Sequence, residues 1–188
     1  AGDRAARLWD LQGNHLAELN NPDGQGGLGE GSRGEVLGVE LSPDRKKLAV
    51  GSKSGDVYLW NFQGRLLSKL EGPPGWLDFR FSSDGTRMAT FGTDNVVRIW
   101  KLNTNNQSEL ETELKGHVGR AWKVEFSHDD RQIITSDSRT IKLWDDKGNQ
   151  IINFLLPDTG FNPLRFFSKN HQIIYRNNSE YTVYIWEI

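Results

Sequence analysis

Short apolar runs separated by polar turns follow one another along the whole chain, and the same order of runs returns about every 40 residues. Within a unit, a strongly apolar run precedes a second apolar run, a third that ends in tryptophan, and an amphipathic fourth. Apolar and polar positions alternate, and β-branched and aromatic residues dominate, which predicts β-strands. Each unit is therefore predicted to hold four short antiparallel strands. The tryptophans are Trp9, Trp60, Trp100, Trp144 and Trp186.

Polar turns between these runs support the interpretation. Their serine and aspartate side chains can bond to nearby backbone, and proline or glycine favours the dihedral angles of a turn. The turns between the first and second strands cover residues 42–45, 82–85 and 127–130. Those between the second and third strands cover 52–55, 92–95 and 136–139.

Repetition at this period is typical of folds in which each unit buries its faces against its neighbours. We predict an all-β fold, a β-propeller built from four-stranded antiparallel blades. The expected count is 17 strands, enough for about four blades with partial ones at the ends. The units are 1–19 (a partial blade), 35–70, 76–114, 121–156, and 164–188, which lacks its outer strand.

One unit also carries a recognisable motif. Gly116-His117, then VEFS at 124–127 and IKLWD at 141–145, resembles a WD repeat. Over essentially its whole length the chain is similar to WD-repeat β-propellers. The segments LQGN at 11–14 and FQGR at 62–65 resemble the many-repeat WD proteins of bacteria, some of which follow a signalling module.

The resemblance implies a structural network inside a blade, joining a histidine before the inner strand, a serine or threonine, an aspartate and the tryptophan. Because buried polar groups must be paired, such a network would hold the loop onto the blade. One unit supplies His117, Thr135 or Ser136, Asp137 and Trp144. The unit before it supplies Thr90, Asp94 and Trp100, with Pro73 and Pro74 in the place of the histidine.

Composition offers little catalytic chemistry. The chain has no cysteine, and its four histidines lie on different units without metal-ligand spacing. Its aspartate-rich turns lack the spacing of a calcium loop, and the glycine-rich segment at 24–31 precedes no helix pattern. We therefore expect no enzyme, no metal and no cofactor.

Charge and hydropathy also restrict the partners. The formal net charge is −2 with both signs well mixed, so nucleic acid is not an expected partner. No apolar stretch approaches the roughly 20 residues of a membrane span, and no signal peptide is evident at the N-terminus. The expected location is cytoplasmic.

The resemblance implies partner binding on the narrower face of the propeller, around its central channel. Aromatic and arginine side chains contribute strongly to interfaces, so Trp122 beside Arg120 is the preferred position and Trp76 the second. Both tryptophans could instead pack between blades. The candidate residues are Trp122, Arg120, Trp76, Leu37, Glu35 and Leu77.

Three functions compete. The leading hypothesis is a non-catalytic scaffold for protein–protein interaction that binds a protein or peptide on the central face. The alternative is a small-ligand-binding or enzymatic propeller with polar groups at the channel mouth, chiefly Glu35 and Asp78. Nucleic-acid binding comes third and would use the loop arginines Arg33, Arg120 and Arg139.

The partial end units pose the question of ring closure, because an open stack of blades would expose apolar faces and strand edges. The favoured explanation is that the chain is the C-terminal part of a larger propeller. Two copies could instead self-associate into one ring. A complete short propeller is the third possibility.

Overall fold

The computed structural model describes residues 5–20, 35–75, 78–103, 107–119, 121–137, 139–155, 164–167, 172–177 and 182–187. These residues form 17 β-strands in five antiparallel sheets and contain no helix. The strand count and the division among sheets agree with the repeat pattern in the sequence.

Each sheet follows the chain in simple up-and-down order. The first sheet holds β1 (Ala5–Trp9) and β2 (His15–Asn20). The second holds β3 (Val36–Leu41), β4 (Lys47–Ser52), β5 (Val57–Asn61) and β6 (Leu66–Leu70). The third holds β7 (Asp78–Phe81), β8 (Arg87–Phe91), β9 (Val97–Leu102) and β10 (Ser108–Leu114). The fourth holds β11 (Ala121–Phe126), β12 (Gln132–Asp137), β13 (Thr140–Asp145) and β14 (Gln150–Leu155). The last holds β15 (Leu164–Phe167), β16 (Gln172–Asn177) and β17 (Thr182–Glu187).

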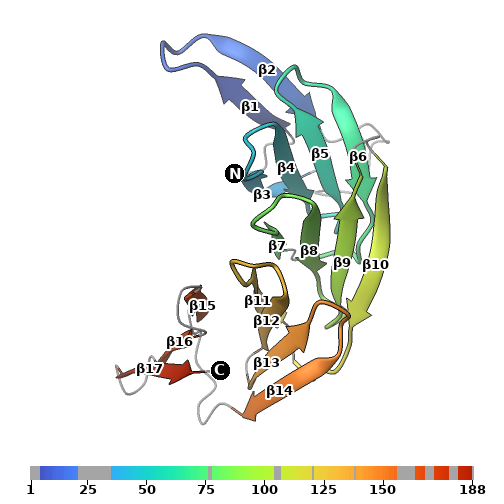
Figure 1. The fold of residues 1–188 in the computed structure, drawn as a ribbon. Helices are drawn as coiled ribbons and strands as arrows, with labels where there is room; N and C mark the ends of the chain where they lie inside the picture. Colours follow the sequence, from blue (N-terminus) through green and yellow to red (C-terminus); the bar gives the residue numbers. More distant parts are fainter. Residues whose placement is uncertain are drawn as a thin grey trace.

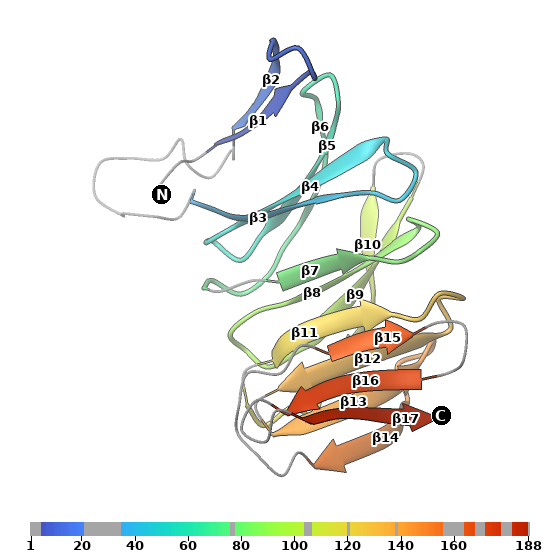
Figure 2. The same ribbon diagram turned by 90° about the vertical axis from the view of Figure 1, so that its left-hand side faces the viewer.

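The sheets stand one behind another along an arc (Figures 1 and 2). The first strands of successive sheets are neighbours: β3 contacts β7, β7 contacts β11, and β11 contacts β15. Strands β6, β10 and β14 lie on the outer, convex side (Figure 1). The predicted all-β fold of propeller blades is confirmed, and the described strands form an open arc.

A repeated turn joins the first two strands of each complete sheet. In all three copies a serine hydroxyl donates to the aspartate two residues on at 2.7 Å, and its oxygen accepts the backbone N–H five residues on at 2.9 Å. These bonds satisfy turn backbone that no strand pairs, which is the reason serine and aspartate recur there. The serines are Ser42, Ser82 and Ser127.

The apolar core lies between the sheets. Trp100 packs with Leu59 and Phe79 between the second and third sheets, and Trp144 packs with Ile99 and Phe126 between the third and fourth. Gly51 on β4 leaves room for the Phe79 ring, because a Cβ at this position would overlap that ring. Each tryptophan thus covers the face of the sheet before its own.

The third and fourth sheets are also joined by polar contacts. The buried carboxylate of Asp130 accepts the backbone N–H of Ser83 at 2.7 Å and that of Asp84 at 2.9 Å. Arg87 donates to the carbonyl oxygen of Asp130, and its guanidinium lies 5.5 Å from the centre of the Phe126 ring. These contacts hold the turn between β7 and β8 against the turn between β11 and β12.

The ends of the arc leave apolar side chains uncovered. Trp9 on the first sheet is 57% exposed, whereas Trp60 at the same position of the second sheet is 6% exposed. Ile185 on the last sheet is also exposed, whereas Leu143 at the matching register of the fourth sheet is fully buried. Trp60 and Leu143 are buried because a neighbouring sheet covers each of these side chains.

Candidate functional site

Loops and turns gather at one end of the sheets. The loops before the inner strands (71–75 and 115–119) meet the turns between second and third strands (52–56, 92–96 and the turn from Asp137); we call this region the loop end. The backbone N–H of Gly75 donates to the carbonyl of Lys53 at 3.1 Å, and the Thr93 hydroxyl donates to the carbonyl of Pro74 at 2.8 Å. Neighbouring sheets are therefore tied together at this end.

Four side chains form a buried chain of hydrogen bonds in the fourth sheet. The Trp144 indole N–H donates to Thr135 Oγ1 at 2.8 Å, and Thr135 Oγ1 lies 2.6 Å from His117 Nε2. His117 Nδ1 lies 2.9 Å from Asp137 Oδ2, and both of these side chains are fully shielded from solvent. The structure thus brings together the residues that the WD resemblance implied, with Thr135 rather than Ser136 as the hydroxyl.

The charges of this network follow from its burial. Burial lowers the pKa of His117, and although hydrogen bonding to Asp137 opposes this, the pKa stays below its ordinary value. A neutral imidazole fits every contact: Nδ1–H donates to Asp137, and Nε2 accepts the Thr135 hydroxyl proton. Burial raises the pKa of Asp137, but N–H donors from Arg139 and Thr140, with His117, outweigh it and lower the pKa overall.

The network fixes a loop and presents one apolar side chain. His117 anchors the segment on one side of Val118, and the backbone N–H of Gly119 donates to Asp137 at 3.4 Å on the other. Val118 between them is 85% exposed. An apolar side chain is therefore displayed by backbone that is held on both sides.

The third sheet keeps only part of this network. The Trp100 indole N–H donates to Thr90 Oγ1 at 2.8 Å, as in the fourth sheet. Asp94 instead accepts from Arg98 at 2.6 Å, and Arg98 also pairs with Glu113 at 3.5 Å. The pair of prolines that replaces the histidine offers no donor to an aspartate.

The second sheet uses a residue that the sequence motif did not single out. Asp56 is buried and accepts from the Ser54 hydroxyl at 3.0 Å, the Gly72 N–H at 3.2 Å and Lys69 Nζ at 3.1 Å. It holds the loop that leads to the third sheet, whereas Asp137 holds the loop that precedes its own sheet. Its only sequence signal is an aspartate directly before the tryptophan strand.

The predicted partner residues are only partly described. Leu37 is half-buried and packs against the core between the second and third sheets, and Glu35 pairs with Lys53 at 3.2 Å. Trp122 lies in β11, and only its backbone is described. The remaining predicted positions, Trp76, Leu77 and Arg120, lie outside the described residues.

The acidic groups proposed for a small-ligand site have partners of their own. Asp78 pairs with Arg80 at 2.9 Å, and Glu35 pairs with Lys53. The Arg139 backbone N–H donates to Asp137, and Arg33 lies outside the described residues. Within the part of the chain that the structure describes, no group of three histidine or acidic residues could hold a metal ion.

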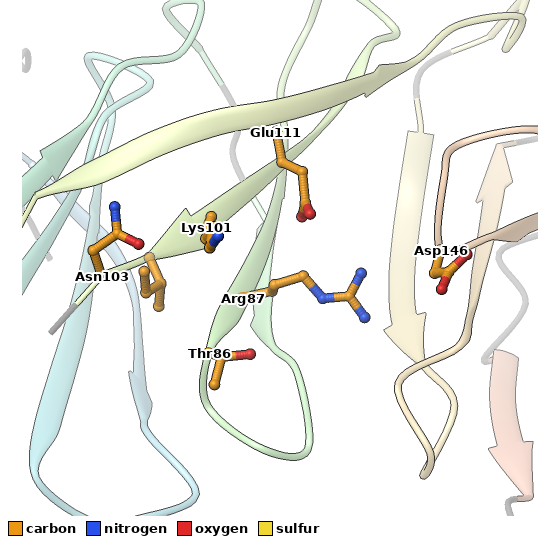
Figure 3. A pocket seen from close by; sticks show the side chains of 7 residues that line it. Thr86, Arg87, Lys101, Asn103, Glu111 and Asp146 are labelled. Atoms are coloured by element: carbon orange, nitrogen blue, oxygen red, sulfur yellow. The ribbon is translucent and has the colours of Figure 1, made fainter.

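A pocket of about 660 Å³ opens at the opposite end of the sheets, between the third sheet and the turn after β13 (Figure 3). Arg87, Glu111 and Asp146 lie around this space (Figure 3). Arg87 donates to the carbonyl of Asp130, and Lys101 also lines the pocket. Among the described residues no helix is long and apolar enough to cross a membrane.

Known proteins share this pattern. The serine-threonine kinase receptor-associated protein of Mus musculus is 31% identical over 61% of this chain and 33% of its own length. The target of rapamycin complex subunit LST8 of Mus musculus is 30% identical over 63% of this chain and 37% of its own length. This chain therefore spans about a third of these relatives. The resemblance to bacterial proteins stays a prediction.

Solved structures share the fold. The computationally designed Ika8 protein superposes with a TM-score of 0.78 and 20% identity, over 100% of this chain and 54% of that chain. The β-propeller domain of Myceliophteria thermophila Cps50 (Swd1) superposes with a TM-score of 0.71 and 14% identity, over 81% of this chain and 54% of that chain. The family model WD40 (WD domain, G-beta repeat) matches residues 28–61, 64–101 and 108–145, more than half of the sequence, and the chain belongs to this family.

Proposed function

We propose that this chain is a non-catalytic scaffold that binds a protein or peptide partner at the loop end of its inner strands. Its membership of the WD40 repeat family supports a scaffold role. Two relatives are named as a receptor-associated protein and as a subunit of a complex, which favours protein partners. Among the residues that the structure describes, no group of histidine and acidic side chains could hold a metal ion for catalysis.

The observation that carries the proposal is the display of Val118. Because His117 and Gly119 are both held by Asp137, little conformational entropy remains to be lost when a partner covers Val118. An exposed apolar side chain on fixed backbone is the kind of anchor that gives an interface its binding energy. Arg120 and Trp122, the preferred partner residues from the sequence, follow directly in the chain, and we propose them as further contacts.

Affinity capture with matched variants tests this proposal. The immobilised chain would be exposed to an extract of its source cells, and the bound proteins identified by mass spectrometry. Val118→Asp should remove the specific partner, because a carboxylate at the centre of an apolar contact would lose its solvation. Trp122→Ala should weaken capture in the same way, with secondary structure and melting temperature little changed.

Leu11 provides the control. This leucine is fully exposed in the turn between β1 and β2, away from the loop end, so Leu11→Asp makes the same chemical change elsewhere. Capture should survive Leu11→Asp. Equal capture by wild type and Val118→Asp, or equal loss in both aspartate variants, would refute a partner site at the loop end.

We also propose a cellular location and two ways in which the arc of blades could be completed. A cytoplasmic location rests on the absence of cysteine. Membership of a larger propeller, or closure of the ring by self-association, is supported by the uncovered Trp9 and Ile185 at the two ends of the arc. Placing either end against another blade would bury these side chains as their equivalents are buried inside the chain.

A further inference from the structure

The outer strands of the arc differ in charge. An outer strand presents unpaired N–H and C=O groups along its free edge, and charged side chains commonly keep another chain from pairing there. Among the described strands, β2, β6 and β10 carry such charges, whereas β14, with the sequence QIINFL, carries none. The charged residues are Glu18 on β2, Lys69 on β6, and Glu109, Glu111 and Glu113 on β10.

Apolar side chains of β14 face solvent. Ile151 is 50% exposed and Leu155 is 80% exposed. A segment of six residues with high β-propensity and without charge, proline or glycine has the composition of strands that pair with other strands. Strand β14 is the last strand of its sheet within the described residues.

A buried lysine holds β14 in place from behind. Lys142 on β13 is buried, and its Nζ donates to the side-chain oxygens of Gln150 at 2.9 Å and Asn153 at 3.1 Å. These bonds occupy the two polar side chains of the strand and add to its ladder with β13. The edge is therefore firmly positioned, and little ordering is needed before it can pair.

The occupant that fits this edge is another copy of the same strand. When a strand pairs antiparallel with its own copy about a two-fold axis, the side chains of the two copies face one another, so a strand that carries several like charges brings them together. Self-pairing of β10 would gather the glutamates of two copies, whereas self-pairing of β14 gathers only apolar and amide groups. A strand from a different protein would need a complementary charge or a pocket to bind specifically, and β14 has no charged side chain to provide such specificity.

We propose that two copies of this chain bind through their β14 strands, which pair antiparallel and join the two fourth sheets into one continuous sheet. The contact would use backbone hydrogen bonds for affinity and would cover Ile151 and Leu155 of both copies. Because the interface is self-complementary, it closes at two copies. It lies on the outer side of the arc, so it does not depend on a partner at the loop end.

Light scattering after size exclusion, over a wide range of protein concentration, tests the proposal. The wild type should be a dimer that dissociates on dilution. Ile151→Lys places an ammonium in the contact in both copies, so it should weaken dimerisation about tenfold or more. Circular dichroism checks that the variant keeps its strands.

Two controls locate the interface. Leu110→Lys makes the same change at a similarly exposed position of β10 and should leave the dimer intact. Trp9→Lys alters the end of the arc and should leave it intact as well. A wild type that is monomeric throughout, oligomers that grow without limit, or a dimer that survives Ile151→Lys but not Trp9→Lys would each overturn the proposal.

Discussion

Thr135 Oγ1 lies 2.6 Å from His117 Nε2, and the same oxygen accepts the indole N–H of Trp144 at 2.8 Å. One hydroxyl thus links a loop residue to the tryptophan that covers the neighbouring sheet. It acts as donor to the imidazole and as acceptor from the indole, so both of its hydrogen-bonding functions are used. In the third sheet Thr90 bonds the indole of Trp100, and the loop before that sheet has proline where His117 would be.

This difference predicts unequal costs for the same substitution. Thr135→Val would leave both the Trp144 N–H and His117 Nε2 buried without a partner, at about 2–4 kcal/mol of unfolding free energy. Thr90→Val would leave only the Trp100 N–H, at about 1–2 kcal/mol. Urea unfolding of both variants measures the difference. Equal losses would show that the histidine bond adds nothing to stability.

The pH dependence of stability should carry the signature of His117. Its pKa is lowered in the folded chain from an ordinary value of 6.5, so the unfolded chain binds the proton more readily. The contribution of this group is complete above pH 6.5 and declines as the pH falls from there toward the folded pKa. His117→Gln should abolish this decline, as measured by urea midpoints at about pH 7.5 and 5.5.

Glu40 on β3 should act in the opposite sense. Burial raises its pKa from 4.5 to about 7, although Arg80 opposes the shift. Its contribution to stability is complete below pH 4.5 and is lost as the pH rises toward 7, because the folded chain keeps this proton up to a higher pH than the unfolded chain does. Glu40→Gln should therefore make the loss of stability on acidification steeper than in the wild type. An unchanged slope would show that Glu40 is effectively solvated.

The regular parts of this fold follow from local chemistry that the sequence displays. Alternation and the tryptophan spacing predicted the strands, and the third strands β5, β9 and β13 hold Trp60, Trp100 and Trp144 as expected. The resemblance to WD repeats also implied a network of His117, Thr135 or Ser136, Asp137 and Trp144, and the structure selects Thr135 as its hydroxyl. Asp137 reaches His117 even though it stands one residue further from its tryptophan than Asp94 does.

Contacts between units are harder to predict, because they depend on how two turns meet in space. Asp130 bonds the backbone of a turn 46 and 47 residues away, and no local pattern indicates that pairing. Asp56 accepts the backbone N–H of Gly72, 16 residues away, and no local pattern indicates that bond either. The sequence did not single out Val118, because its exposure depends on how the loop folds and is held on either side.

Asp130 provides a test of how much such an inter-sheet contact contributes. Asp130→Ala removes both acceptors of the Ser83 and Asp84 N–H groups and places alanine at a φ of 57°, so it should cost about 2–3 kcal/mol. Asp130→Asn keeps one oxygen and a side chain that tolerates this backbone, so it should cost about half as much. Hydrogen exchange at Ser83 and Asp84 should accelerate in the alanine variant. Unchanged exchange there would contradict the bonding seen between the sheets.

The second sheet contains a defect that can be repaired. The Trp60 indole N–H is buried without a hydrogen-bond partner among the described residues. Val50 occupies the register of Thr90 and Thr135, which accept from the equivalent tryptophans in the next two sheets.

Val50→Thr is nearly isosteric and would place a hydroxyl where the Trp60 indole can donate to it. The substitution should raise the unfolding free energy by about 1 kcal/mol, because one buried unpaired donor is satisfied. In a Trp60→Phe background the same hydroxyl has no indole to accept from, so Val50→Thr should be destabilising there by about 1 kcal/mol or more. A double-mutant cycle from urea unfolding measures the coupling directly. Equal effects of Val50→Thr in the two backgrounds would show that no bond to Trp60 forms, and the register equivalence of the three sheets would then fail at the level of side-chain geometry.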